Sequence, residues 1–130
     1  DQALAGDWSA LVLLAGYAQD GTKWVGARSI PSLTLAGKKD CSAELATVQE
    51  GWARLPSPAF LTTLEGVTHY QFTDSQKEDE PDCAPSIPLE TAHARIATQV
   101  GDFLDGALRS DARAWERLTA PAEGVEGVRR

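Results

Sequence analysis

The sequence contains no methionine, only two cysteines and two histidines, and fewer basic than acidic residues. Twelve Lys and Arg stand against 19 Asp and Glu in 130 positions, for a formal net charge of −7. The longest apolar run, Ala10–Ala15, is far shorter than the roughly 20 residues that a membrane-spanning helix needs. No Lys or Arg cluster is dense enough to follow a phosphate backbone. These features exclude a membrane span and make nucleic acid an unexpected partner.

The start of the chain has no methionine and no basic segment followed by an apolar stretch, as a secretion signal would have. We therefore expect the amino terminus to have been processed, cut or truncated. The apolar content of 42% is that of a folded protein. The length predicts one domain over residues 1–120, with a flexible tail over 121–130, where Gly, Glu, Val and Arg follow no period.

Motifs for metals and phosphates are also missing. The histidines and cysteines show no C-x-x-C or H-x-x-x-H spacing, and the sequence has neither a phosphate loop nor G-x-G-x-x-G. We therefore expect no metal and no cofactor. The cysteine count alone leaves open whether Cys41 and Cys83 form a disulfide or remain two buried thiols.

Three apolar segments have the length of β-strands: residues 10–16, 32–37 and 59–64. The first two lack strict polar alternation, which is typical of strands covered on both faces. Each segment ends at a glycine or is followed by one within two residues. The pattern predicts three strands of a sheet that helices cover on both sides.

Helical periodicity lies between and after these segments. Apolar residues recur every three or four positions over 45–55, with Ser42 as the expected cap and Pro56 as the stop. A long helix is predicted over 89–108 and a shorter amphipathic one over 111–118. The order strand, helix, strand predicts parallel crossovers. The fold class expected is therefore α/β, with parallel strands and flanking helices.

A sheet of three parallel strands leaves rows of unpaired backbone groups at its edges. The pattern is typical of one end of a larger doubly wound sheet. The remaining strands would come from another chain, from a second copy, or from sequence outside these 130 residues.

Two candidate reactive residues follow neighbouring predicted strands. Reactive groups in parallel α/β sheets gather at the carboxyl ends of the strands. Asp40 follows the second strand in a Gly-Lys-Lys-Asp segment, and His69 follows the third in a Gly-Val-Thr-His segment. A carboxylate beside an imidazole holds one tautomer and stabilises the imidazolium cation. We therefore expect Asp40 and His69 to form an acid–base pair.

Each of these residues also has an ordinary interpretation. An Asp at a strand end is commonly a helix cap or a turn former, and a His in a loop is commonly solvated. His93 competes as the base, although its place on the apolar face of the long helix indicates a hydrogen-bonded boundary residue. Asp20 and Asp74 compete as the orienting acid.

The same segments resemble α/β-hydrolases. Residues 30–40 look like the penultimate strand of that family, where a Pro leads into an apolar strand that ends in Gly-x-x-Asp. Residues 66–74 look like the Gly-x-x-His segment that follows, and the spacing of 29 residues between acid and base (69 − 40) suits one helix and one strand. The nearest groups are dienelactone hydrolases and the chlorophyllase-like or polyester-hydrolase-like enzymes. The resemblance covers about 10–108, the latter half of a whole hydrolase.

The resemblance implies that Asp40 is the catalytic acid and that His69 is the general base for a serine nucleophile acting on a small ester. It also implies that Cys41, directly after the acid, pairs with Cys83, beyond the histidine. A disulfide implies an oxidising compartment, the periplasm or the exterior. Trp24, in the connection over the expected site, is a candidate substrate contact.

The sequence departs from the family pattern at the nucleophile. It has no G-x-S-x-G motif, and the early loop that supplies part of the oxyanion hole is missing. We therefore interpret the chain as the carboxy-terminal part of a serine ester hydrolase, not competent alone. A nucleophile-bearing amino-terminal segment or a second copy would complete it.

The alternative function is that of a non-catalytic, hydrolase-derived half-domain that self-associates or binds a partner. A third hypothesis is a free-standing domain that binds a small ligand and is stabilised by the disulfide.

Overall fold

The structure is a computed structural model of the chain, and it describes residues 8–19, 29–74 and 83–130. Four strands form one sheet in the order β1–β2–β3–β4. Their bounds are Leu11–Leu14 (β1), Ser32–Gly37 (β2), Ala59–Leu64 (β3) and Val125–Arg129 (β4). The first three are parallel, and β4 runs antiparallel to β3. The expected α/β class, with parallel strands and flanking helices, is confirmed.

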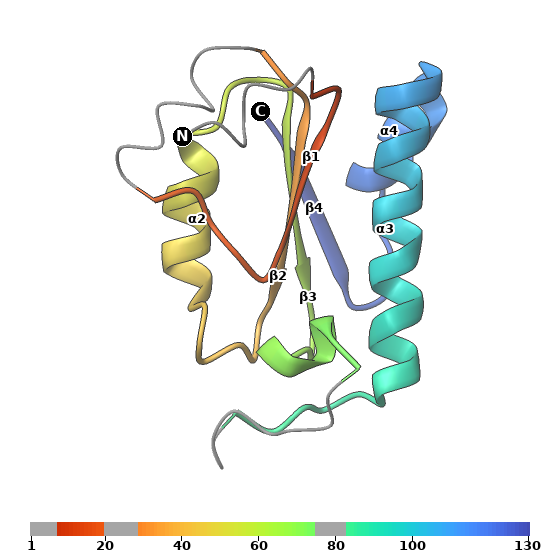
Figure 1. Ribbon diagram of the computed structural model, residues 1–130. Coiled ribbons are helices and arrows are strands. Elements are labelled where there is room, and N and C mark those ends of the chain that lie inside the picture. The colour runs from red at the N-terminus through yellow and green to blue at the C-terminus, as the bar shows by residue number, and fades with distance from the viewer. Residues whose placement is uncertain (1–7, 20–28, 75–82) are drawn as a thin grey trace.

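Helices cover both faces of this sheet (Figure 1). Helix α2 (Leu45–Ala53) lies on one face, and α3 (Leu89–Arg109) and α4 (Ala112–Thr119) lie on the other. A short 3-10 helix, η1 (His69–Phe72), lies at the end where β2 and β3 finish. No helix in the described ranges is both long enough and apolar enough to cross a membrane.

The core has one layer on each side of the sheet. Leu33 and Leu35 of β2 and Phe60 of β3 pack with Phe103 and Leu118 on the side of α3 and α4. The opposite side carries smaller clusters under α2, formed by Ala36, Val48, Leu55, Ala59 and Leu61 with their neighbours. Every residue of β2 and β3 is buried. Burial on both faces explains why these strands lack simple polar alternation.

The expectation of a flexible tail over 121–130 is wrong for residues 125–129, which form β4. Val125 pairs with Leu64, and the ladder continues to Arg129 opposite Phe60. Val125 packs against the core, and the Arg129 guanidinium lies 5.2 Å from the ring centroids of both Phe60 and Trp115. The strand carries two charged residues, Glu126 and Arg129, as an edge strand commonly does, and these charges conceal the pairing from an apolar pattern.

The expected capping of α2 by Ser42 is also wrong. The residue before the helix is Glu44, and it makes no side-chain cap. The backbone N–H groups of Ser42 and Ala43 donate instead to the carboxylate of Asp40. Ser42 therefore belongs to the turn bonded to Asp40, and it lies two residues before the N-cap position. The capping of α4 by Asp111 follows the expected pattern.

Strand β4 packs closely against the end of α4, so one methyl group added at this contact should change the stability of the protein. A Cβ on Gly127 would lie 1.7 Å from the carbonyl oxygen of Leu118, whereas a Cβ on Gly101 of α3 would meet no atom within 4 Å. Gly127→Ala should therefore lower the free energy of unfolding by more than about 2 kcal/mol. The control Gly101→Ala should raise it by about 0.5–1 kcal/mol, because alanine favours a helix. Denaturant unfolding of the two variants measures both; equal stabilities would contradict the packing of β4.

Candidate acid–base site

The site lies beyond the carboxyl ends of β2 and β3, where backbone bonds keep the two chain segments together. The N–H of Lys38 donates to the carbonyl of Leu64, and the N–H of Lys39 donates to the carbonyl of Val67, each at 3.0 Å. A Cβ on Gly37 would lie 2.3 Å from the Val67 carbonyl oxygen. Only glycine allows this approach, so the sequence at the end of β2 brings Asp40, three residues further on, close to the segment that carries the histidine.

The Asp40 carboxylate meets both a turn and the imidazole. Its Oδ1 accepts the backbone N–H groups of Ser42 at 2.9 Å and Ala43 at 2.6 Å. Its Oδ2 lies 2.9 Å from Nδ1 of His69. The ordinary interpretation of Asp40 as a turn former and the interpretation as a partner of His69 are therefore both correct, one for each oxygen.

The ring of His69 is positioned by the short helix it begins. Thr68 and Gln71 form a capping box, in which the Thr68 N–H donates to Gln71 Oε1 at 3.1 Å and the Thr68 hydroxyl accepts the Gln71 N–H. The buried Gln71 amide also donates to the carbonyl of Ile87 at 2.9 Å. Tyr70 packs edge-to-face on the imidazole at 5.8 Å. The imidazole is therefore attached to a small, well-bonded unit.

The two side chains differ sharply in exposure. The Asp40 side chain is 1% exposed and that of His69 is 34% exposed. An ionised carboxylate only accepts hydrogen bonds, so in a neutral imidazole this contact favours the tautomer with its proton on Nδ1 and its basic lone pair on Nε2. A buried acid behind a partly exposed imidazole is the arrangement found in Ser-His-Asp triads, where the imidazole acts as general base.

A disulfide joins the two halves of the site. Cys41 and Cys83 are bonded, with their Cα atoms 6.1 Å apart, which confirms the expected pairing. Cys41 is exposed and adjoins Asp40, whereas Cys83 is buried. The segment after Cys83 also bonds toward the end of β3, because the N–H of Ser86 donates to the carbonyl of Gly66 at 3.0 Å. The bond therefore connects the turn that holds the acid to the segment against which η1 packs.

The competing residues do not share this place. Nε2 of His93 lies 2.9 Å from the carbonyl oxygen of Thr73, as expected for a hydrogen-bonded boundary histidine. Asp74 is exposed at the end of a described range. Asp20 and Trp24 lie outside the described residues. Among the candidate acids in the described part of the chain, Asp40 is the one that contacts His69.

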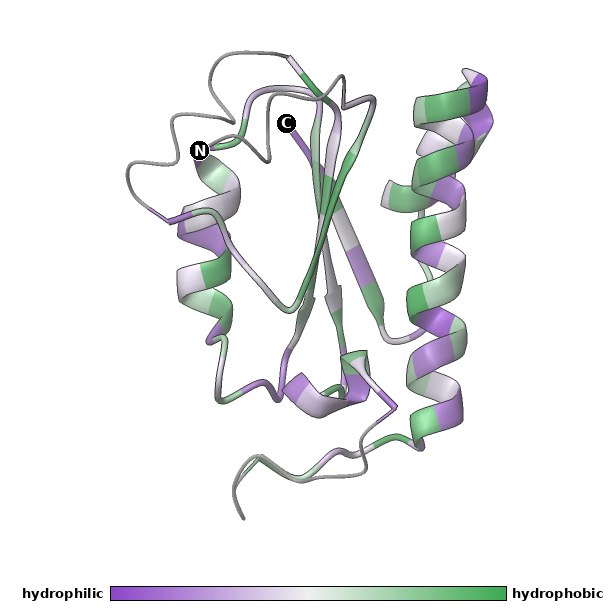
Figure 2. Cartoon of the chain, viewed as in Figure 1, coloured by the Kyte–Doolittle hydropathy of each residue, from purple (hydrophilic) through white to green (hydrophobic). Residues whose placement is uncertain are grey.

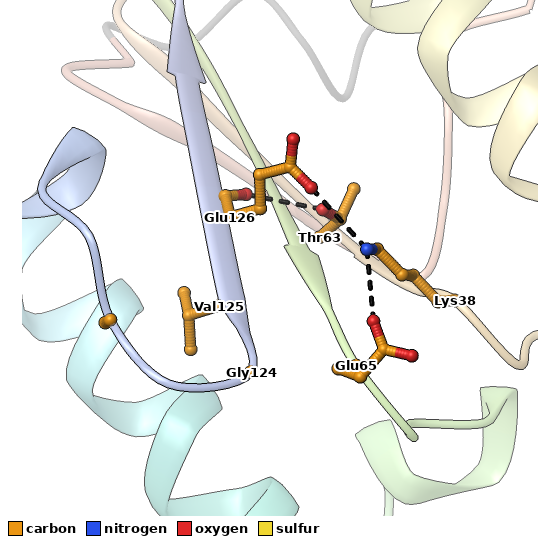
Figure 3. A pocket seen from close by; sticks show the side chains of 7 residues that line it. Lys38, Thr63, Glu65, Gly124, Val125 and Glu126 are labelled. Carbon is orange, nitrogen blue, oxygen red and sulfur yellow. Dashed lines mark hydrogen bonds and ion pairs between the residues drawn. The ribbon is translucent and has the colours of Figure 1, made fainter.

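An ion cluster around Lys38, directly after β2, was not predicted from the sequence. Nζ of Lys38 lies 3.0 Å from Glu65 and 3.5 Å from Glu126 of β4, beside a cavity of about 280 Å³ (Figure 3). The hydrogen bond to Glu65, with the attraction of both carboxylates, raises the pKa of the Lys38 ammonium. The cavity is lined by Thr63 and Val125 among others, and Asp40 and His69 are not part of its lining. No sequence signal points to this cluster, and one of its two carboxylates, Glu126, belongs to the unexpected strand β4.

A scan against protein-family models found no match, and neither did a search of curated proteins. Within the described ranges, no group of three or more His, Cys, Asp or Glu side chains is placed to hold a metal ion.

The disulfide predicts a large loss of stability when it is removed. It joins residues 42 positions apart, and the chain-entropy model gives about 4 kcal/mol for a loop of that length. The double variant Cys41→Ser, Cys83→Ser should lose about 2–4 kcal/mol of unfolding free energy, measured by denaturant titration without reductant. Adding a reductant should lower the unfolding free energy of the parent chain and leave that of the double variant unchanged. A double variant as stable as the oxidised parent would refute the structural importance of the bond.

Proposed function

We propose that this chain supplies the acid and the general base of a serine ester hydrolase of the α/β-hydrolase type. The observation that carries the proposal is the 2.9 Å contact between Oδ2 of Asp40 and Nδ1 of His69, beyond the carboxyl ends of two neighbouring parallel strands. The sheet would then be the carboxy-terminal part of a larger doubly wound sheet. The serine nucleophile and the oxyanion donors would come from a segment outside these residues.

Each residue has a defined role in this proposal. His69 takes the proton from the serine hydroxyl as its oxygen attacks the ester carbonyl, and later returns it to the departing alcohol. Asp40 keeps the proton of the resting imidazole on Nδ1 and stabilises the imidazolium that forms. In the second half of the cycle His69 activates a water molecule that cleaves the acyl-enzyme. The bonds from Ser42 and Ala43 hold the carboxylate still through these steps.

We also propose a cellular compartment and a substrate class for this hydrolase. The Cys41–Cys83 bond supports an extracytoplasmic location, periplasmic or secreted, since disulfides persist in oxidising environments. The substrate class is a small carboxylic ester. The proposal needs no cofactor, because the acid–base pair and a serine suffice for acyl transfer.

Labelling with a fluorophosphonate probe tests this function. The complete product of the gene that encodes this chain should react covalently at one serine. His69→Ala and Asp40→Asn should lower the labelling rate constant by about 10³-fold or more, because the serine loses its base or the base loses its tautomer. His93→Gln is the matched control and should label at the parent rate. If the complete product does not label, or labels equally fast without His69, the proposed function is wrong.

A second candidate function, a self-associating module, is favoured by the character of the edge strand β1. This strand consists of Leu, Val, Leu and Leu without any charge, and hydrophobic residues follow one another along it (Figure 2). Leu14 is 45% exposed, and Trp8 just before the strand is 52% exposed. The other edge, β4, carries the charged residues Glu126 and Arg129, and charges protect an edge against pairing. An apolar edge of this kind can pair with another strand, including that of a second copy.

Light scattering on the full chain tests the second candidate. Self-association through β1 predicts a dimer that Leu14→Lys dissociates, because a buried ammonium has no partner at a paired edge. Val128→Lys, at a residue 42% exposed on the opposite edge strand, should leave the dimer intact. A monomeric parent chain, or equal behaviour of the two variants, would exclude self-association through β1.

A further inference from the structure

Three buried polar atoms on the side of α2 have no hydrogen-bonding partner among the residues that the structure describes. They are Oγ of Ser32, Oγ1 of Thr34 and Nε1 of Trp52. Ser32 is 1% exposed and Thr34 is fully buried. A buried polar group without a partner costs about 1–3 kcal/mol, so three such atoms in one layer require an explanation.

The strand register places these atoms in the same part of the core. Leu33 and Leu35 of β2 face α3, so Ser32 and Thr34, the alternate residues, face α2. Thr34 lies between Leu13 of β1 and Leu61 of β3.

The indole of Trp52 packs on the two small clusters of that face. One contains Ala59, with Leu13 packed against it, and the other contains Ala36 and Leu61. These residues flank Ser32 and Thr34 in the sheet, so Trp52 packs on the part of the α2 face that carries the two hydroxyl groups.

Small side chains line the α2 face of the sheet at this position. Ser32, Thr34 and Ala36 follow one another along the α2 face of β2, and Ala59 lies beside Ser32 in β3. An indole N–H only donates, whereas a hydroxyl both donates and accepts, so the three atoms offer a complementary set of bonds. A water molecule accepts one or two hydrogen bonds and donates two, and buried waters commonly make about three.

We propose that one internal water molecule lies between α2 and β2 and bridges the indole N–H of Trp52 to the hydroxyl groups of Ser32 and Thr34. The water accepts from the indole and exchanges hydrogen bonds with the two hydroxyls. It stabilises the packing of α2, the helix that follows the turn formed by Asp40, on the sheet.

Thermal unfolding of the full chain and of Thr34→Val tests the bridge through the sign of the effect. The substitution keeps the shape of the side chain and removes its hydroxyl. If the water is bound, the melting temperature falls by about 3–5 °C, because a satisfied bond is lost. If the hydroxyl has no partner, removing it raises the melting temperature or leaves it unchanged, which would overturn the proposal.

A double-mutant cycle and a crystal structure complete the test. Trp52→Phe removes the indole N–H, and the double variant Thr34→Val, Trp52→Phe should lose less than the sum of the two single losses, since both act on one water. A crystal structure at about 1.5 Å resolution should show a water within about 3 Å of all three atoms. Additive losses, an absence of density, or a direct bond between Trp52 and a hydroxyl would refute the proposal.

Discussion

The site depends on the hydrogen bonds of the Asp40 carboxylate, which uses one oxygen for the backbone and the other for the imidazole. One oxygen is held by two backbone N–H groups of the following turn, and the other faces Nδ1 of His69. A carboxylate bonded only to the turn would form a simple local motif. A carboxylate bonded only to the ring would be free to rotate away from it. Together, the contacts fix an almost fully buried acid in the one orientation that determines which imidazole nitrogen carries the proton.

The surrounding fold maintains this arrangement from several directions. The parallel register of β2 and β3 brings their carboxyl ends together, and Gly37 lets the backbones meet beyond the sheet. The capping box of η1 orients the histidine, and the Cys41–Cys83 bond connects the turn of the acid to the segment behind the base. These supports come from parts of the chain far apart in sequence. They leave the imidazole about one-third exposed, while the acid remains covered.

The sequence predicted correctly the features that a local residue pattern determines. It failed for features that depend on a particular side-chain contact or on strand pairing. The bounds of β2 and β3 were predicted as observed, because glycine ends one apolar run and Glu65-Gly66 follows the other. The contact between Asp40 and His69 followed from the parallel order of the strands. The capping of α2 by Ser42 was wrong because Ser42 belongs to the turn bonded to Asp40, two residues before the N-cap position. Strand β4 was missed because its pairing with β3 is a tertiary event, and the ion cluster around Lys38 was missed with it.

The most direct test of the account is the proton position on the His69 ring. Nitrogen-15 spectra of the full chain in mildly alkaline solution distinguish the two neutral imidazole tautomers, with His93 as an internal comparison. The account predicts that the proton of His69 is on Nδ1, and that Asp40→Ala shifts the population toward the Nε2 tautomer. A parent ring protonated mainly on Nε2, or a tautomer population that Asp40→Ala leaves unchanged, would contradict the central role of the Asp40–His69 bond.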